Sequence, residues 1–531
     1  MKKILNRYNI TLGTIIVMHI FVILYWGNKK EGYHIDEVYS YGLANSYYAP
    51  FMDSNNDYWD NWHDANYLLD YVSVSTEHTF AYDSVYYNQT QDVHPFLYYT
   101  LLHTVCSLFP DTFSKWYAIG INIVFSVLTV IVLYSLARRT LDRNRWEAVI
   151  LTGVYALSAG AISNAIYLRM YVLLTFWTLL YTFLHVCMYE KKDKRFLLSI
   201  MLVTGMGGLT QYYFYIFAFF ISVFYVIYLL LRRKWKDLLQ YCASMICSLG
   251  INVLIYPSTL EHIFNGYRGT EAVDNLAKSN LIEQTTSFFS YVNMELLGGK
   301  LKWMILGMTL ICLMSVFKKY ISIEQLGIHV VVDRVFRMTK KKYMILALFG
   351  SVIGYFVIVS KISTIVANRY IFPIYPLIVL CVFTGLHFVW KETEVKEGFY
   401  LAILVLFWSW ITVSEYQNHY VDYVYAGYEE TQDTIAQYHD KDVLYIADYL
   451  FPVYRDKMFL ETAERFIPIT HMDFSQKLHT LELKNEEDGI VVYVYKEHEA
   501  DSVFEELQQQ LNYNHFEFVA ETYQSMVYYC Y

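Results

Sequence analysis

Residues Phe214–Leu231 have the sequence FYIFAFFISVFYVIYLLL, which contains no charged side chain. An α-helix of this length is about 27 Å long, close to the ~30 Å thickness of the hydrocarbon core of a bilayer. Runs of similar character occur at Ile10–Trp26 and Ile119–Leu136. Hydrophobic residues make up 56% of the chain and charged residues 17%, and the mean hydropathy is +0.25. Soluble domains contain about 45–50% hydrophobic and about 25% charged residues. The composition of this chain therefore excludes a soluble enzyme, a disordered protein and a nucleic-acid binder, and indicates a multi-pass membrane protein.

The apolar runs and the basic clusters between them predict about eleven membrane spans. Loops rich in Lys and Arg stay in the cytoplasm, and the spans alternate without conflict when every basic cluster is placed there. The N-terminus, which carries Lys2, Lys3 and Arg7, is then inside and the C-terminus outside. The segment Pro95–Phe109 is too short to cross, and we expect it to enter the membrane from outside without spanning it. The predicted spans are 10–26, 116–136, 147–165, 170–189, 196–211, 213–231, 238–256, 302–317, 343–360, 370–390 and 398–413.

Charge divides the chain into a membrane domain and an acidic tail. Residues 414–531 contain 23 acidic and 7 basic side chains, a net charge of −16, whereas the remaining residues carry +7. We therefore expect a transmembrane domain over residues 1–413, with extracytoplasmic loops at 27–93 and 257–301. The tail, 414–531, is predicted to be a separate domain on the extracytoplasmic side.

The pattern of the tail predicts a small α/β domain. Runs rich in β-branched and aromatic residues occur at Val443–Ala447, Ile490–Tyr495 and Phe516–Val519. A polar stretch with helical character lies between the last two, at Asp501–Leu511. Alternation of such runs with helical stretches is typical of α/β folds.

The first candidate functional residues follow the first span, in the sequence His34-Ile-Asp36-Glu37-Val-Tyr39. An aspartate at an outward-facing polar site can take a proton from an acceptor hydroxyl, with a neighbouring group tuning its pKa. Two acids also suit the first turn of a helix, so the motif alone leaves both interpretations open.

A second motif, Asp92-Val-His94-Pro95, opens the short apolar segment on the same predicted face. Pro95 suits a first helical turn and Asp92 suits the position that caps it. Alternatively, His94 at the mouth of a buried helix can orient a substrate or a carboxylate.

Basic side chains occur on the predicted outer face, against the positive-inside bias. Arg169 and Tyr171 lie between two spans, and Arg369 and Tyr370 follow Lys361 before a later span. An arginine near the hydrocarbon is costly unless it is paired or reaches the interface. A lipid phosphate in the outer leaflet is the natural counter-ion for these cations.

The chain is rich in aromatic residues, which make up 18% of it and include 53 tyrosines. Gln211, Tyr212 and Tyr213 form an aromatic stretch on the predicted outer face. Such a stretch can serve as a ledge for a sugar ring, although core packing explains each tyrosine taken alone.

Five motifs occur in an order that resembles the protein O-mannosyltransferase-like members of the GT-C superfamily, glycosyltransferase family 39 and its bacterial relatives, which include the aminoarabinose transferases. The resemblance covers about residues 10–390. The motifs are the acidic pair after the first span, Asp92-Val-His94-Pro95-Phe-Leu-Tyr98-Tyr99, Arg169-Met-Tyr171, Thr210-Gln211-Tyr212-Tyr213 and Arg369-Tyr370-Ile-Phe-Pro373-Ile-Tyr-Pro376.

The resemblance implies a polytopic GT-C-like fold and an inverting transfer of a sugar from a polyprenyl-phosphate-linked donor. No cofactor and no divalent metal are expected, and the acceptor is a protein, a glycolipid or a wall polymer in a bacterial plasma membrane. The resemblance implies that Asp36 is the catalytic base, with support from Glu37, and that Asp92 and His94 shape the acceptor side. Gln211, Tyr212 and Tyr213 would form the ledge for the sugar. The residues that would bind the donor phosphate and lipid are Arg169, Tyr171, Lys361, Arg369 and Tyr370.

The chain departs from the family motifs at two positions, and two alternative functions remain open. Relatives often have a second proline where this chain has Phe96, and a histidine where it has Gln211, which leaves the details of the donor pocket open. A glycan polymerase or ligase of the envelope also uses outer arginines on lipid diphosphates. A lipid-linked sugar flippase or transporter favours polar groups at mid-membrane depth and two matching halves, whereas no internal repeat is evident here.

Overall fold

The computed structural model describes residues 6–52, 58–64, 66–190, 194–307, 309, 339–393, 395–484 and 488–531. The chain forms two compact units. The first contains Met1–Trp26, Val93–Tyr98 and Ile119–Asp422, and the second contains Gly27–Asp92, Tyr99–Ala118 and Tyr423–Tyr531. The second unit therefore includes the first predicted loop as well as most of the predicted tail domain.

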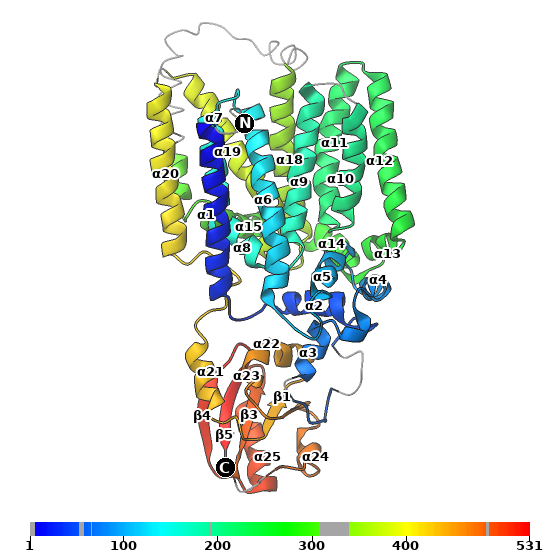
Figure 1. The fold of residues 1–531 in the computed structure, drawn as a ribbon, viewed down its shortest axis with the longest axis vertical. Coiled ribbons are helices and arrows are strands. Elements are labelled where there is room, and N and C mark those ends of the chain that lie inside the picture. Colours follow the sequence, from blue (N-terminus) through cyan, green and yellow to red (C-terminus); the bar gives the residue numbers. More distant parts are fainter. Residues whose placement is uncertain are drawn as a thin grey trace. The chain divides into compact units, whose positions relative to one another are not determined.

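The first unit is a bundle of long apolar helices that run side by side (Figure 1). Among the described residues, eight helices are long and apolar enough to cross a membrane. They are α1 (Arg7–Lys29), α6 (Lys115–Thr140), α9 (Tyr171–Glu190), α11 (Tyr213–Leu231), α12 (Trp235–Ile255), α18 (Lys340–Ile362), α19 (Tyr375–Lys391, counted with the turn before it) and α20 (Glu397–Gln417). The predicted polytopic helical fold is confirmed.

Three predicted spans need separate comment. The span 147–165 is a bent pair, α7 (Arg145–Ala156) and α8 (Ala159–Ile166), whose axes differ by 51°. The span 196–211 corresponds to α10 (Lys194–Gly208), which is shorter than the long helices. The span 302–317 lies mostly outside the described residues. The short segment after Pro95 forms α5 (Leu97–Cys106), about 15 Å long and half the hydrocarbon thickness.

The long segment that was predicted to be an outer loop, residues 257–301, folds mainly into three short helices. They are α13 (Ser258–Phe264), α14 (Tyr267–Lys278) and α15 (Leu281–Glu295). Two short 3-10 turns, η2 (Asn368–Tyr370) and η3 (Phe372–Ile374), precede α19. Pro373 and Pro376 fall at the starts of η3 and α19, where a missing N–H is not needed.

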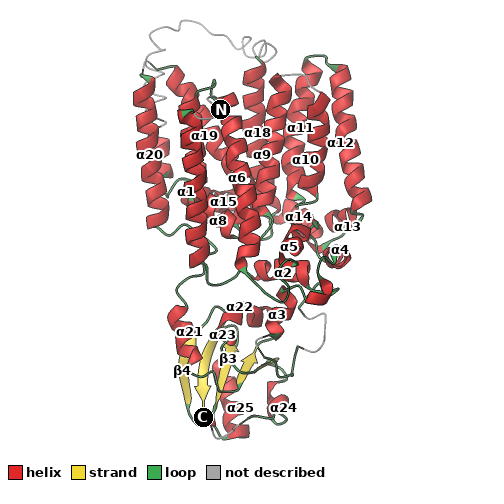
Figure 2. Cartoon of the chain, viewed as in Figure 1, coloured by secondary structure: helices red, strands yellow, loops and turns green. Residues whose placement is uncertain are grey.

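The second unit contains the β-sheet of the protein, shown in yellow in Figure 2. Its strands are β1 (Val443–Ile446), β2 (Phe466–Ile469), β3 (Ile490–Tyr495), β4 (Phe516–Glu521) and β5 (Ser525–Cys530), in the order β2-β1-β3-β5-β4. The first three strands are parallel, and β5 is antiparallel to both β3 and β4. Its helices are α2 (Ile35–Asn45), α3 (Tyr67–Val72), η1 (Thr76–His78), α4 (Tyr82–Gln91), α21 (Glu429–Ala436), α22 (Leu450–Arg455), α23 (Lys457–Leu460), α24 (Phe474–Leu478) and α25 (Ala500–Leu511), together with residues 99–106 of α5.

The predicted α/β character of the tail is confirmed, and the first loop extends its sheet. All six residues of β3 are buried, as expected for a central strand covered on both faces. At the β2 edge, His63 and Phe466 exchange backbone hydrogen bonds of 2.8 Å, and the Asp60 N–H donates to the Pro468 carbonyl at 2.9 Å. The loop thereby covers an edge that would otherwise expose unpaired backbone groups.

Candidate active site

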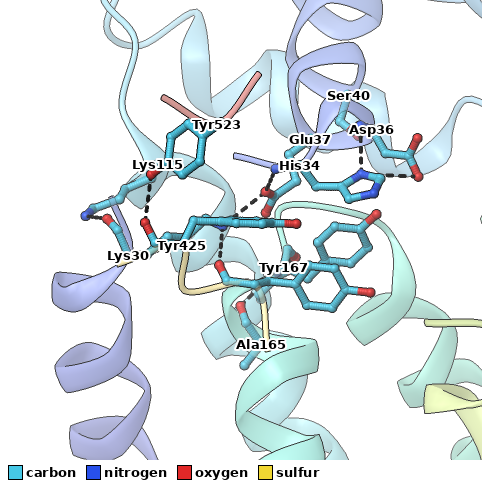
Figure 3. A network of polar contacts seen from close by, with 12 residues as sticks. Lys30, His34, Asp36, Glu37, Ser40, Lys115, Ala165, Tyr167, Tyr425 and Tyr523 are labelled. Atoms are coloured by element: carbon cyan, nitrogen blue, oxygen red, sulfur yellow. Dashed lines mark hydrogen bonds and ion pairs between the residues drawn. The ribbon is translucent and has the colours of Figure 1, made fainter. Parts of the chain in front are cut away.

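The acidic pair lies in the first turn of α2, where both acids satisfy the local needs of a helix start. His34 is the N-cap residue, and its Nδ1 accepts a hydrogen bond from the Asp36 N–H at 3.1 Å. The Glu37 carboxylate reaches back and accepts from the His34 N–H at 2.6 Å. This reciprocal arrangement is a capping box, and Figure 3 shows it from close by.

Glu37 is fully buried and forms an ion pair with a lysine from the end of the first span. The Lys30 Nζ lies 3.0 Å from Glu37 Oε2, and both side chains have no solvent exposure. The same ammonium donates to the Tyr423 carbonyl at 2.6 Å and lies 5.2 Å from the centre of the Tyr425 ring (Figure 3). Glu37 therefore joins α2 to the segment that enters the tail.

Asp36 differs from its neighbour because water can reach it. Its side chain is 29% exposed, and Oδ2 lies 3.8 Å from His34 Nδ1. An exposed carboxylate beside an imidazole can accept a proton, whereas a buried, ion-paired carboxylate is poorly suited to do so. The two adjacent acids therefore have different surroundings: Glu37 is buried and ion-paired, whereas Asp36 is accessible to water.

The second motif is divided between the two units. Asp92 is the C-cap residue of α4, and α5 begins only at Leu97, so Asp92 does not occupy the first turn of the next helix. His94 belongs to the first unit, where its Nε2 lies 3.4 Å from an Arg169 guanidinium nitrogen. The histidine therefore contacts one of the two arginines singled out from the sequence.

Arg169 lies in the short connection between α8 and α9 and is only 4% exposed. The backbone N–H of Arg169 donates to the Tyr167 carbonyl at 2.8 Å, so the connection is a tight turn. Asn122 of α6 also donates to the Tyr167 carbonyl, at 2.8 Å. The Tyr167 and Tyr171 rings stack with their centres 5.9 Å apart, so aromatic rings flank the arginine in sequence on both sides.

Arg369 lies in the turn η2 and is 6% exposed. The Tyr370 ring contacts the ring of Tyr213 at 5.4 Å and that of Tyr171 at 6.5 Å between centres. The hydroxyl of Tyr355 donates to the Tyr370 carbonyl at 2.8 Å. Tyrosines from three of the motifs quoted above thus meet in the first unit.

The remaining sequence candidates have local partners. The Lys361 ammonium donates to the Ser279 carbonyl, and the Ser279 hydroxyl donates back to the Lys361 carbonyl at 2.8 Å. The buried Gln211 side chain accepts from the Tyr213 N–H at 3.4 Å. The Tyr212 hydroxyl lies 3.1 Å from Nδ1 of His262 on α13. Lys361 therefore holds the end of α14, and Tyr212 contacts the outer segment.

Sequence reasoning missed a buried carboxyl group beside the Arg369 turn. Glu295 ends α15, and its Oε1 accepts from the Asn368 side-chain amide at 2.6 Å. Tyr375 donates to the other Glu295 oxygen, and the Asn368 amide also donates to Asp422 at 3.0 Å. Burial raises the pKa of Glu295 to about 8, and the nearby Asp422 adds to this rise against the opposing hydrogen bonds. No sequence signal marks Glu295, since acids at helix ends are common.

A further cation near this region comes from the amphipathic helix α14. Arg268 donates to the hydroxyl of Thr364 at 3.0 Å and to Glu271 at 2.9 Å. Burial lowers the pKa of the Arg268 guanidinium, but Tyr267, Tyr370 and Glu271 outweigh this effect and raise the pKa above its ordinary value. The sequence alone gave no reason to join Arg268 to Tyr370, because about 100 residues separate them.

No resident metal site is evident in the ranges given above. Among those described residues, no group of three or more His, Cys, Asp or Glu side chains is placed to hold a metal ion. The cysteines whose surroundings are described are all free.

Comparison with known proteins bears on the fold of the chain. Residues 93–256 match the model of the dolichyl-phosphate-mannose-protein mannosyltransferase family. The crystal structure of ArnT from Cupriavidus metallidurans bound to undecaprenyl phosphate aligns over 97% of this chain and 97% of that chain, with a TM-score of 0.52 and 12% identity. The chain has the GT-C glycosyltransferase fold. The resemblance inferred from the five motifs is therefore confirmed for the fold. In addition, residues 93–256 match the sequence pattern of the dolichyl-phosphate-mannose-protein mannosyltransferase family.

Other matches are weaker. The apo state of the same ArnT aligns over 92% of this chain and 95% of that chain, with a TM-score of 0.47 and 13% identity. The oligosaccharyltransferase of Archaeoglobus fulgidus, in complex with Zn and sulfate, covers 97% of this chain and 72% of its own, with a TM-score of 0.49 and 13% identity. No curated protein matches the chain significantly in sequence.

We predict that Lys30→Met destabilises the protein by about 3–5 kcal/mol, because it leaves the Glu37 carboxylate buried without its counter-ion. Thermal unfolding in detergent measures this effect. Adding Glu37→Gln to the same chain should recover part of the loss, and Lys29→Met, at an exposed neighbouring position, should change little. Equal unfolding temperatures for Lys30→Met and Lys29→Met would contradict the assigned ion pair.

Proposed function

We propose that the protein transfers a sugar from a polyprenyl-phosphate-linked donor to an acceptor on the extracytoplasmic side of a bacterial plasma membrane, with inversion at the sugar carbon. The observation that supports this most directly is a pair of almost fully buried arginines, Arg169 and Arg369. Each adjoins a tyrosine, and the two tyrosine rings, Tyr171 and Tyr370, are in contact. The solved structure that shares the fold carries undecaprenyl phosphate.

The arginines bind the phosphate that leaves the sugar. Negative charge grows on the phosphate oxygen as the bond to the sugar breaks, and preorganised cations in a site of low dielectric stabilise that charge. Guanidinium groups suit this task because they bind phosphate with two parallel hydrogen bonds. Arg268, which interacts with Tyr370, adds a third cation to the donor side.

The Glu295 network positions the turn that carries Arg369. Its contact with Asn368 anchors one side of the turn, and Tyr355 holds the Tyr370 carbonyl on the other side. Because the pKa of Glu295 is about 8, the carboxyl group is mostly neutral at pH 7 and adds little negative charge beside the arginine. A fixed arginine stabilises developing charge without reorganisation.

Asp36 acts as the general base. It removes the proton from the acceptor hydroxyl while the oxygen attacks the sugar carbon, and the donor phosphate leaves with the bonding electrons. Its exposure favours this role over Glu37, which supports α2 through Lys30. His94, held beside Arg169, and Asp92 belong to the acceptor side, and Gln211, Tyr212 and Tyr213 to the sugar ledge. The contact of Lys361 with Ser279 favours a role in holding α14 near the donor lipid.

We predict that Asp36→Asn lowers donor turnover about 10²–10⁴-fold, the usual contribution of a general base, without altering thermal unfolding. Purified protein is given a panel of polyprenyl-phosphate sugars and crude envelope acceptors, and the released polyprenyl phosphate is measured. Glu77→Gln, at a second acid of the same loop, is the matched control. Turnover by Asp36→Asn close to wild type would exclude the assigned base, and loss of turnover in EDTA would contradict a metal-independent transfer.

We predict that Arg369→Ala weakens binding of the donor about 10- to 100-fold, as expected for the loss of a hydrogen bond to a charged group. Arg369→Lys should retain part of the affinity because it keeps the charge. Binding of a polyprenyl phosphate is measured by titration of the purified protein. Lys236→Ala, at an exposed position at the start of α12, is the control, and unchanged affinity in Arg369→Ala would remove Arg369 from the phosphate site.

The proposed orientation places the N-terminus in the cytoplasm and the tail outside. Met472 of the tail is 86% exposed, whereas Cys530 is buried. We predict that Met472→Cys in intact cells reacts with a membrane-impermeant maleimide, whereas Lys236→Cys reacts only after the membrane is permeabilised. The reverse pattern would invert the topology.

A further inference from the structure

An apolar groove of about 950 Å³ is lined by residues of α1, α7 and α20. The helices α1 and α20 lie at one edge of the bundle (Figure 1). The groove belongs entirely to the first unit and does not include any candidate site residue. Val, Ile, Leu and Trp side chains form most of its lining, and small residues occur at Gly153 of α7 and at Gly398 and Ala402 of α20. A Cβ added at Gly398 would have no heavy atom within 4 Å, so this part of the groove is open.

The dimensions of the groove suit an extended hydrocarbon chain. Its lining on α20 runs from Gly398 to Val413, a rise of about 22 Å at 1.5 Å per residue. This length exceeds half of the ~30 Å hydrocarbon thickness, the share of one leaflet. The polar atoms in the lining belong mostly to hydroxyl groups, such as those of Thr11 and Ser409.

Two arginines lie at one end of the groove. Arg7, Thr11 and Ile15 share one face of α1, and the last two line the groove. The Arg7 guanidinium lies 5.3 Å from the ring centre of Trp146, which also lines the groove, and the Arg145 guanidinium lies 5.3 Å from the ring centre of Tyr8.

The other charges at this end leave both arginines available. Glu397 accepts a hydrogen bond from the Asn144 side chain at 3.0 Å, and Lys396 precedes it. Within the part of the chain that the structure describes, neither Arg7 nor Arg145 forms an ion pair with an acidic side chain. The helices α1, α7 and α20 all begin at this end, so the positive ends of three helix dipoles add to the local potential.

We propose that this groove is a binding site for an anionic phospholipid, separate from the donor site. An acyl chain occupies the groove between α1, α7 and α20, and the lipid phosphate binds Arg7 and Arg145, with Trp146 at the level of the headgroup. Basic residues beside a gap between membrane helices bind anionic headgroups in this way. In the proposed orientation the lipid belongs to the cytoplasmic leaflet, although the chemistry of the site does not depend on the orientation.

A helix from a second copy of the chain is the competing occupant, because small residues favour close helix packing in membranes. A symmetric dimer through this groove would bring the basic ends of α1 and α7 against their own copies. Repulsion between these like charges opposes that arrangement, whereas an anionic lipid neutralises them.

Native mass spectrometry of the purified protein, with phosphatidylglycerol and phosphatidylcholine as probes, tests the proposal. We expect wild type to retain one phosphatidylglycerol and to bind it roughly 10- to 30-fold more tightly than phosphatidylcholine, from about 1 kcal/mol for each arginine. Arg7→Gln with Arg145→Gln should abolish this preference. Gly398→Leu, which fills the groove, should weaken binding of both lipids, whereas Gly120→Leu, at an open position on α6, should not.

Four outcomes would overturn the proposal. The first three are equal affinity of wild type for the two lipids, retention of the preference in Arg7→Gln with Arg145→Gln, and a dimer that Gly398→Leu converts to monomer. The fourth is displacement of the bound lipid by polyprenyl phosphate, which would assign the groove to the donor carrier instead. Thermal unfolding identifies any variant that fails to fold. If the double Gln variant fails to fold, the single variants Arg7→Gln and Arg145→Gln serve in its place, and each should lower the preference. Arg7→Lys with Arg145→Lys, which keeps the charge, is the control and should retain it.

Discussion

The hydrocarbon core of a membrane cannot solvate charge, and this constraint decides where the first unit places its ionisable side chains. Charged groups that are buried there have partners. Near the end of α19, His387 contacts the Glu147 carboxylate at 2.6 Å, and Tyr400 donates to the same group. Near the start of α19, Asn368 and Tyr375 hold Glu295. The two networks tie α19 to neighbouring helices at both ends, and the second one also carries the turn of Arg369.

In the second unit, the two acids at the start of α2 differ in their surroundings. A carboxylate that must remain buried is neutralised by a fixed cation, as Glu37 is by Lys30, and it then serves to join segments. The carboxylate of Asp36, by contrast, is 29% exposed, so water reaches it. Adjacent acids in one helical turn point in different directions, so a single turn holds one buried, ion-paired acid and one that water reaches.

Much of the fold could be predicted from local pattern. The long apolar runs correspond to helices, and β1, β3, β4 and α25 lie where the tail pattern placed them. The strands β2 and β5 were not predicted from the sequence. β2 has only four residues and includes Pro468, and proline is rare in strands. The loop segment around His63 pairs with it at the sheet edge. The division into units was also not visible, because Gly27–Asp92 joins the tail through contacts far apart in the sequence.

The sequence by itself determined that this is a multi-pass membrane protein with an acidic α/β tail, and its motifs indicated the GT-C fold. Those properties can be read from short segments, because whether a segment enters the hydrocarbon core depends on its length and on the hydrophobicity of its own residues. Only the tertiary structure decided which acid is exposed and which is paired. Lys30 bonds to a carbonyl 393 residues away, and Asn368 to a glutamate 73 residues away. Such pairing is a property of side chains that meet only after folding, and no local pattern records it.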